Sequence, residues 1–184
     1  MTARDQARHN FHRRVPEGDN QERLVCRDCG HVQYDNPKVV VGAVCTWEGR
    51  ILLCLRDIEP RAGFWTLPAG YLELHESPMD GAMREAQEEA RAEIAIDQLL
   101  AVYDIPRLSQ VQLIYRARLL SPDVAAADET REDGLFDWDD IPWDDIAFPT
   151  VHWALRAHRE VRSLPSFGPF ANPAGDTPDR LERG

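Results

Sequence analysis

The sequence predicts an α+β domain in which helices cover a mixed β-sheet, and three observations lead to this prediction. Short apolar segments rich in β-branched residues recur through the middle of the chain. A helix pattern with a clear start signal follows Ser77, and a second helix pattern occupies 149–161. Strands that come before and after a helix are typical of a layered α/β/α domain.

The composition limits the class of protein. The chain has 184 residues and a formal net charge of −11, which is enough length for one domain with a small appendage. A nucleic-acid polymer is not expected as a partner, because such partners usually need a basic face. The N-terminus is polar, and no apolar run reaches the roughly 18–20 residues that span a membrane. We therefore expect a cytoplasmic protein without a membrane partner.

Turn signals divide the chain into three parts. Residues 1–37 are expected to form a small ribbon-like extension, 38–163 the main domain, and 164–184 a loosely ordered tail rich in Pro and Gly. Within the main domain, the expected strands are 39–45, 51–55, 64–67, 99–105, 111–119 and 135–138, with an acidic loop over 121–134.

The helix after Ser77 has the strongest start signal in the chain. Ser77 is a suitable N-cap, Pro78 suits the first helical position, and Asp80 completes a pattern like a capping box. Alanine then recurs at every fourth position, which gives a narrow apolar stripe for close packing on a sheet (Ala82, Ala86 and Ala90).

Three glutamates on this helix are spaced so that they can bind one cation together. Glu85, Glu88 and Glu89 follow an i, i+3, i+4 pattern, so their side chains converge on one helix face. Their like charges repel. The helix dipole favours acidic residues only in the first turn, and these glutamates lie beyond it. Mg²⁺ or Mn²⁺ prefers carboxylate oxygens and would remove this repulsion. The alternative is a solvated acidic face without a ligand.

A wider pattern around these glutamates resembles the Nudix box. That motif places a glycine, a glutamate and an Arg-Glu-apolar-x-Glu-Glu run at fixed spacing. The matching residues here are Gly70, Glu76, Arg84, Glu85, Ala86, Glu88 and Glu89. The resemblance implies a Nudix α/β/α sandwich and a Mg²⁺-dependent pyrophosphohydrolase that cuts the diphosphate of a nucleotide derivative.

The resemblance also implies roles for individual residues of the box. The three glutamates would be metal ligands, together with a backbone carbonyl near Ala69 and Gly70. Arg84 would orient one of the glutamates, and Glu76 would hold Arg84. The family usually has a glycine two residues after the last glutamate, whereas this chain has Arg91. We therefore expect a changed helix C-cap without a loss of activity.

The remainder of the chain is similar to a Nudix subgroup that carries an N-terminal zinc ribbon. The segments that carry this similarity are 35–42, 64–71 and 141–148. Members of the subgroup cleave ADP-ribose or FAD, so the resemblance implies a dinucleotide-like diphosphate as the substrate. It also implies a homodimer.

Zinc is less favoured than the divalent metal of the box. The ribbons of the subgroup hold zinc with two CxxC pairs, which form a closed tetrahedral site. This chain has one such pair, Cys26 and Cys29, and no cysteine before it. His9 and His12 have a compatible spacing but lie too close to the Pro16 turn to replace the missing pair. A metal-free knuckle is therefore favoured over a zinc site.

The general base has to reach the attacking water directly or through one other water. In relatives that cleave ADP-ribose, a glutamate shortly before an aromatic strand often takes this role, and Glu129 and Glu132 occupy such positions. The relatives often have arginine where this chain has Gly134, which departs from the pattern. The alternatives are a solvated acidic loop and a base supplied by Glu89 or another glutamate of the box.

We expect Arg56, Gly70 and Tyr71 to contact the substrate. Arginine suits phosphate geometry, although Arg56 can also be a simple strand-end cation. Phe64, Trp65 and Tyr71 can stack on a base or flavin ring, but aromatic residues beside a sheet are more often part of a core.

Two other functions fit parts of the sequence. A nucleoside triphosphate or NADH pyrophosphatase would use the same box. A regulator that binds ADP-ribose without cleaving it is the alternative outside the enzymes, but such proteins commonly lose glutamates of the box, and all three are present here.

Overall fold

The computed structural model describes residues 10–127 and 129–176, and the chain divides into two compact units, Met1–Asn36 and Pro37–Gly184. The first unit is an antiparallel sheet of three short strands, β1 (Phe11–Arg14), β2 (Arg23–Cys26) and β3 (Val32–Gln33). Val25 on the middle strand is fully buried.

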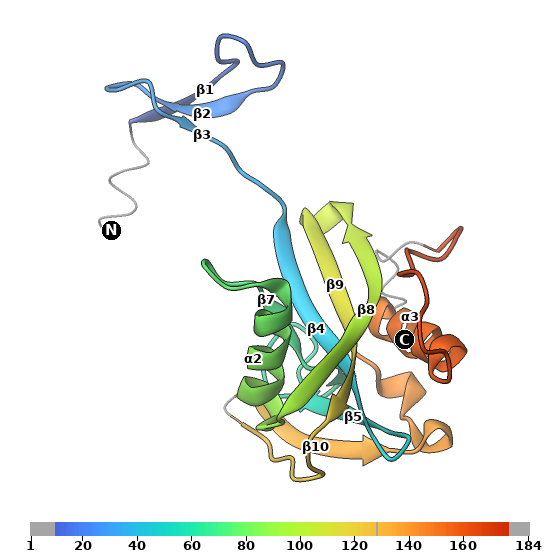
Figure 1. Cartoon of the computed structure of the whole chain (residues 1–184). Helices are drawn as coiled ribbons and strands as arrows, with labels where there is room; N and C mark the ends of the chain where they lie inside the picture. Colours follow the sequence, from blue (N-terminus) through green and yellow to red (C-terminus); the bar gives the residue numbers. More distant parts are fainter. Residues whose placement is uncertain (1–9, 128, 177–184) are drawn as a thin grey trace. The chain divides into compact units, whose positions relative to one another are not determined.

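The second unit is built on a mixed sheet (Figure 1). Its main strands lie in the order β10-β5-β4-β9-β8, while two short strands, β6 and β7, pair with β5 and β4. Strands β4 and β9 are parallel and the other paired strands are antiparallel. The strand bounds are β4 (Lys38–Trp47), β5 (Arg50–Arg56), β6 (Trp65–Thr66), β7 (Ala69–Tyr71), β8 (Ile94–Ile105), β9 (Gln110–Leu119) and β10 (Thr130–Phe136).

Two helices cover opposite faces of this sheet, α2 (Pro78–Ala90) and α3 (Pro149–Val161) (Figure 1). The alanine stripe of α2 packs in one core cluster with Val41 and Cys45 of β4. Trp153 and Leu155 of α3 pack in a second cluster with Leu53 of β5. This layering confirms the predicted α/β/α arrangement. The described residues also contain three 3₁₀ turns, η1 (Pro106–Leu108), η2 (Trp138–Asp140) and η3 (Trp143–Asp145).

Both ends of α2 are capped locally. The Ser77 hydroxyl accepts a hydrogen bond from the Asp80 N–H at 3.2 Å, as the sequence predicts. At the other end the expected change of C-cap is wrong. Arg91 takes the left-handed conformation that glycine normally provides, with φ 49°, and its N–H donates to the Gln87 carbonyl at 3.0 Å. This conformation costs a non-glycine residue about 1–2 kcal/mol, which the closure of the helix offsets.

The acidic loop expected over 121–134 is shorter in the structure, because 130–134 belong to a strand. Strand β10 begins at Thr130 and pairs antiparallel with β5, with a register shift between Thr130 and Glu132. Residues 137–138, expected to end this strand, instead lead into η2. Pairing with the edge of a buried strand outweighs the low strand propensity of the acidic residues.

Part of the expected loosely ordered tail has a defined place against β8. The Phe170 N–H donates to the Leu100 carbonyl, and the Val102 N–H donates to the Phe170 carbonyl, both at 2.9 Å. The Trp153 indole N–H donates to Asp176 at 3.0 Å. Residues 177–184 lie outside the part that the structure describes. None of the helices in the described ranges is long and apolar enough to cross a membrane.

Candidate active site

Arg84 links the loop before α2 to the glutamates on the helix. Its Nε and Nη2 donate to the two carboxylate oxygens of Glu76 at 3.0 and 2.9 Å, which is a bidentate pair. Its Nη1 donates to Glu85 and to Glu88, each at 2.8 Å, and Nη2 also donates to the Tyr71 carbonyl at 3.0 Å. The hydrogen bond from Arg84 lowers the pKa of Glu76 to about 2. One guanidinium therefore fixes three of the carboxylates that the sequence singles out.

Two of the three helix glutamates are buried. Glu85 and Glu89 are each 8% exposed, whereas the Glu88 side chain is 59% exposed. Glu89 accepts a hydrogen bond from the Ala69 N–H at 2.9 Å. The Glu85 carboxylate packs on Gly70 so closely that a Cβ there would lie 2.3 Å from its Oε2. The short strand β7 and the helix thus meet through these carboxylates.

Burial makes the negative charges on this face costly. Burial, together with the neighbouring charge of Glu85, raises the pKa of Glu89 to about 8, and the hydrogen bond from the Ala69 N–H and the charge of Arg56 act in the opposite direction. Burial also raises the pKa of Glu85, and Arg84 opposes that rise.

The donor set fits a hard divalent cation. Mg²⁺ and Mn²⁺ take carboxylate and carbonyl oxygens and keep several waters, and two buried carboxylates beside an exposed one offer such oxygens. Within residues 10–127 and 129–176, no group of three His, Cys, Asp or Glu side chains is arranged as a ready coordination sphere. The three helix glutamates do not form such a sphere because their oxygens have other partners. Arg84 Nη1 donates to Glu85 and to Glu88, whereas Glu89 accepts from the Ala69 N–H. Ala69 contacts the cluster through its N–H, so its carbonyl as a ligand remains a prediction.

The raised pKa of Glu89 predicts a pH-dependent stability in the absence of metal. Between its ordinary value of 4.5 and about 8, the folded carboxyl keeps a proton that the unfolded chain has released. Stability contributed by this group therefore falls as pH rises through that window. In EDTA, we expect the melting temperature of the wild type to fall relative to that of Glu89→Gln as the pH rises through this window. Addition of Mg²⁺ at pH 8 should reduce the difference between the two melting temperatures. A difference in melting temperature that is the same at every pH would contradict the assignment.

Arg56 and Glu129 lie near the buried glutamates. The Arg56 Nε donates to the Pro60 carbonyl at 3.0 Å and its guanidinium lies 5.3 Å from the centre of the Phe148 ring. After burial, the charge of Glu129 is among the smaller causes that raise the pKa values of Glu85 and Glu89. The structure therefore brings Glu129 toward the box.

Glu132 points elsewhere. It lies opposite Leu55 in the β10–β5 pair, and the next pair is Asp133 with Cys54. Because side chains alternate along a strand, Asp133 shares the α2 face with Cys54, which belongs to the core cluster under α2. Glu132 is on the other face. Of the two candidate bases, Glu129 is the one whose charge contributes more to the raised pKa values of Glu85 and Glu89.

Asp133 is a residue of this region that the sequence reasoning missed. Both of its carboxylate oxygens are buried without a hydrogen-bond partner in the described part of the chain. Burial raises the pKa of Asp133 to about 6, although the adjacent Cys54 thiol acts in the opposite direction. Asp133 could have been found if its segment had been predicted as a strand paired with the buried strand β5. The sequence instead predicts a loop there.

The aromatic residues of the region separate into two groups. Tyr71 is 50% exposed, and the Lys38 ammonium lies 5.0 Å from the centre of its ring. Trp65 packs edge-on against Phe136 at 4.9 Å and belongs with the α3 core. Tyr71 therefore keeps a free ring surface next to Gly70, whereas Trp65 has its place in the core.

The cysteine pair of the first unit forms a knuckle. Hydrogen bonds from the backbone N–H groups of Cys29 and Asp28 lower the pKa of the Cys26 thiol. In the described ranges, neither cysteine is part of a group of metal-binding side chains. His9 lies outside the described residues.

Comparison with known proteins places this geometry in a family. A model described as the NUDIX domain matches residues 36–159, and a model described as Nudix N-terminal, a zinc-ribbon family, matches residues 9–35. The solved NUDIX hydrolase from Nitrosomonas europaea is 44% identical, with a TM-score of 0.82 over 88% of this chain and 93% of that chain.

Two further relatives have ADP-ribose pyrophosphatase in their names. The ADP-ribose pyrophosphatase of Methanocaldococcus jannaschii is 27% identical over 113 residues, which are 59% of this chain and 67% of that protein. A bifunctional NMN adenylyltransferase/ADP-ribose pyrophosphatase from Francisella tularensis, solved with AMP and a manganese ion, is 21% identical. Its TM-score is 0.62 over 69% of this chain and 42% of that chain, which shows a shared fold.

The matched domain covers more than half of the chain and contains the carboxylate helix. Nudix hydrolases generally use divalent metal ions and act on small nucleotide diphosphates. The chain therefore belongs to the Nudix family of hydrolases, with the N-terminal segment of its zinc-ribbon subgroup.

Proposed function

We propose that this chain hydrolyses the diphosphate of a nucleoside diphosphate derivative such as ADP-ribose or FAD, using Mg²⁺ or Mn²⁺. The observation that carries the proposal is the pair of buried carboxylates, Glu85 and Glu89, which share one helix face with the exposed Glu88. Their burial is costly unless a cation neutralises them. The ADP-ribose pyrophosphatase from Methanocaldococcus supports this choice of substrate class.

The residues around the cluster have separate tasks in this proposal. Arg84, held by Glu76, keeps Glu85 and Glu88 in place, and the Ala69 N–H holds Glu89. The metal, when bound, would screen the charge of the diphosphate and activate the attacking water. Arg56 would bind a phosphate oxygen, and the free ring face of Tyr71 would stack on the base or flavin.

Glu129 is the proposed base. It would take a proton from the water, whose oxygen forms a bond to one phosphorus as the bridging P–O bond breaks. The bridging oxygen leaves with the other phosphate, so the products are a nucleoside monophosphate and the phosphate of the second group. The placement of Glu129 supports it over Glu132, and a glutamate of the box remains the alternative base.

A substrate screen tests the proposal. The purified protein is incubated with ADP-ribose, FAD, NADH and nucleoside triphosphates, with and without Mg²⁺, and the products are identified by mass spectrometry. We expect Mg²⁺-dependent release of AMP from ADP-ribose or FAD. Preferred cleavage of NADH or of nucleoside triphosphates would show that the proposed substrate class is wrong. Binding of ADP-ribose without hydrolysis would support a sensor instead of an enzyme. The proposed homodimer is tested separately, by the molar mass from light scattering.

A further inference from the structure

Two ion pairs of the second unit share one geometry outside the box. In each, the Nε and Nη2 atoms of an arginine contact a single carboxylate oxygen. The distances are 3.1 and 2.7 Å for Arg131 with Asp57, and 2.5 Å each for Arg116 with Asp97. The two aspartate side chains are also similarly exposed, at 49% and 51%. The pairs differ in the segments that they join.

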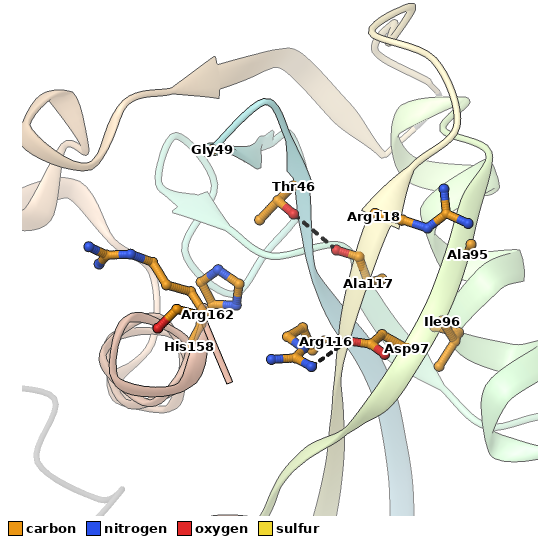
Figure 2. Close-up of a pocket in the computed structure, with 11 residues that line it drawn as sticks. Thr46, Gly49, Ala95, Ile96, Asp97, Arg116, Ala117, Arg118, His158 and Arg162 are labelled. Carbon is orange, nitrogen blue, oxygen red and sulfur yellow. Dashed lines mark hydrogen bonds and ion pairs between the residues drawn. The ribbon is translucent and has the colours of Figure 1, made fainter. Parts of the chain in front are cut away.

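The Arg116 pair belongs to the packing of α3. Arg116 of β9 and Asp97 of β8 line a cavity opposite His158 of α3 (Figure 2). The Arg116 side chain is only 10% exposed, and its Nη1 also donates to the Val161 and Leu164 carbonyls at 2.8 and 3.0 Å. This pair therefore ties the end of α3 to the sheet, and its role is structural.

The Arg131 pair lies at an irregularity of the sheet. The register of β10 against β5 shifts between Thr130 and Glu132, so β10 carries one residue more than its partner there. Such bulges are common next to active sites, where they re-aim a side chain. The Arg131 side chain is 59% exposed, and an ion pair in this position adds little to folding stability because water and salt screen it. Stability is therefore a weak explanation for the pair.

Glu129 comes directly before this bulge. It lies in a turn, closed by the hydrogen bond from the Thr130 N–H to the Ala127 carbonyl at 3.0 Å. The Asp57 N–H donates to the Glu129 carbonyl at 3.0 Å. Asp57 thus contacts this segment twice, through its backbone at Glu129 and through its carboxylate at Arg131.

Asp57 is itself held at the end of β5. It follows Arg56, whose N–H donates to the Phe64 carbonyl at 3.0 Å and whose carbonyl accepts from the Gly63 N–H at 2.9 Å. These bonds close the loop that begins at Asp57. The ion pair therefore connects the segments of two groups named in the proposed reaction, Arg56 and Glu129.

We propose that Asp57 and Arg131 are positioning residues for the reaction, with their ion pair holding Glu129 within reach of the attacking water. The inference rests on the proposed function, because it takes Glu129 as the base. A base acts only within about 3 Å of the water or through one other water. A shift of the turn therefore lowers turnover without weakening substrate binding, and loss of either partner should lower kcat at an unchanged KM.

Steady-state kinetics of Asp57→Asn and Arg131→Gln, with the substrate that the screen identifies, tests the inference. We expect each variant to lower kcat about tenfold, because a small displacement at an active site is costly. The double variant should lower kcat no further, since both single changes break the same pair. Exchange of the two charges, in Asp57→Arg/Arg131→Asp, should recover part of the loss.

Asp97→Asn is the matched control. It breaks the ion pair of the same geometry beside α3, and its carboxylate has nearly the same exposure as that of Asp57. This variant should lower the melting temperature, because Arg116 loses its partner, and should leave kcat unchanged.

A background without the base separates positioning from a purely structural role. In Glu129→Gln, the further change Asp57→Asn should leave kcat as it is, because no base remains to be placed. A structural role would lower kcat by the same factor in both backgrounds and would contradict the inference.

The outcomes also separate this inference from the proposed function. If the wild type releases AMP but Asp57→Asn keeps the wild-type kcat, the inference is wrong and the proposed function stands. If Glu129→Gln keeps the wild-type kcat, the base is wrong and the inference fails with it. A wild type that hydrolyses none of the substrates of the screen overturns both.

Discussion

Glu89→Gln is expected to lower kcat for the diphosphate substrate by about 10²–10³-fold, because a metal ligand supplies several kcal/mol of transition-state stabilisation. The substitution removes the carboxylate charge but keeps an oxygen that can accept the Ala69 N–H now bonded to Glu89 at 2.9 Å. The fold should therefore be retained, and the loss should appear in turnover. Steady-state kinetics at saturating substrate, with circular dichroism of each protein, is the measurement.

Glu93→Gln is the matched control for this variant. Glu93 is exposed and lies just beyond the C-terminal end of α2. The variant therefore makes the same replacement of glutamate by glutamine outside the cluster. Its replacement should leave kcat unchanged. If Glu89→Gln turned over substrate as fast as Glu93→Gln, the assignment of Glu89 as a metal ligand would be wrong.

Gly70→Ala is expected to lower kcat by about 10–100-fold with little change in melting temperature, since a displacement of about 1 Å at an active site can cost about 100-fold. The added Cβ would lie 2.3–2.4 Å from three atoms of the Glu85 carboxyl group. The carboxylate must then move, and its ion pair with Arg84 at 2.8 Å restricts where it can go. The Mg²⁺ concentration for half-maximal activity should rise as well.

Gly168→Ala is the control for the added methyl group, because a Cβ at Gly168 meets nothing within 4 Å. Neither glycine has a positive φ, so backbone strain does not separate the two variants. Equal kcat values for Gly70→Ala and the wild type would show that the position of the Glu85 carboxylate does not matter for the reaction.

The sequence predicts the features of this molecule that depend on local spacing. The N-cap at Ser77 and the shared helix face of the three glutamates follow from local geometry, and the structure shows the cap. It brings Glu85 and Glu88 together at Arg84, whereas Glu89 accepts from the Ala69 N–H. The bounds of α3 follow from its periodicity in the same way. The mixed sheet follows from the order of apolar segments before and after the helix.

What the sequence does not predict depends on pairing between distant segments. Glu129 and Glu132 look alike as candidate bases, and only the register of β10 against β5 separates them. The same register buries Asp133 beside Cys54. Arg91 shows a different limit, because closure of the helix end outweighs the preference of the left-handed conformation for glycine.

The dependence of turnover on divalent metal tests the central claim most directly. Protein dialysed against EDTA is assayed with the substrate that the screen identifies while Mg²⁺, and in a second series Mn²⁺, is added back. We expect no turnover in EDTA and a saturable recovery with either ion in the wild type, and little recovery in Glu89→Gln. Undiminished hydrolysis in EDTA would contradict the account, because the buried carboxylates of α2 would then serve no metal in the reaction.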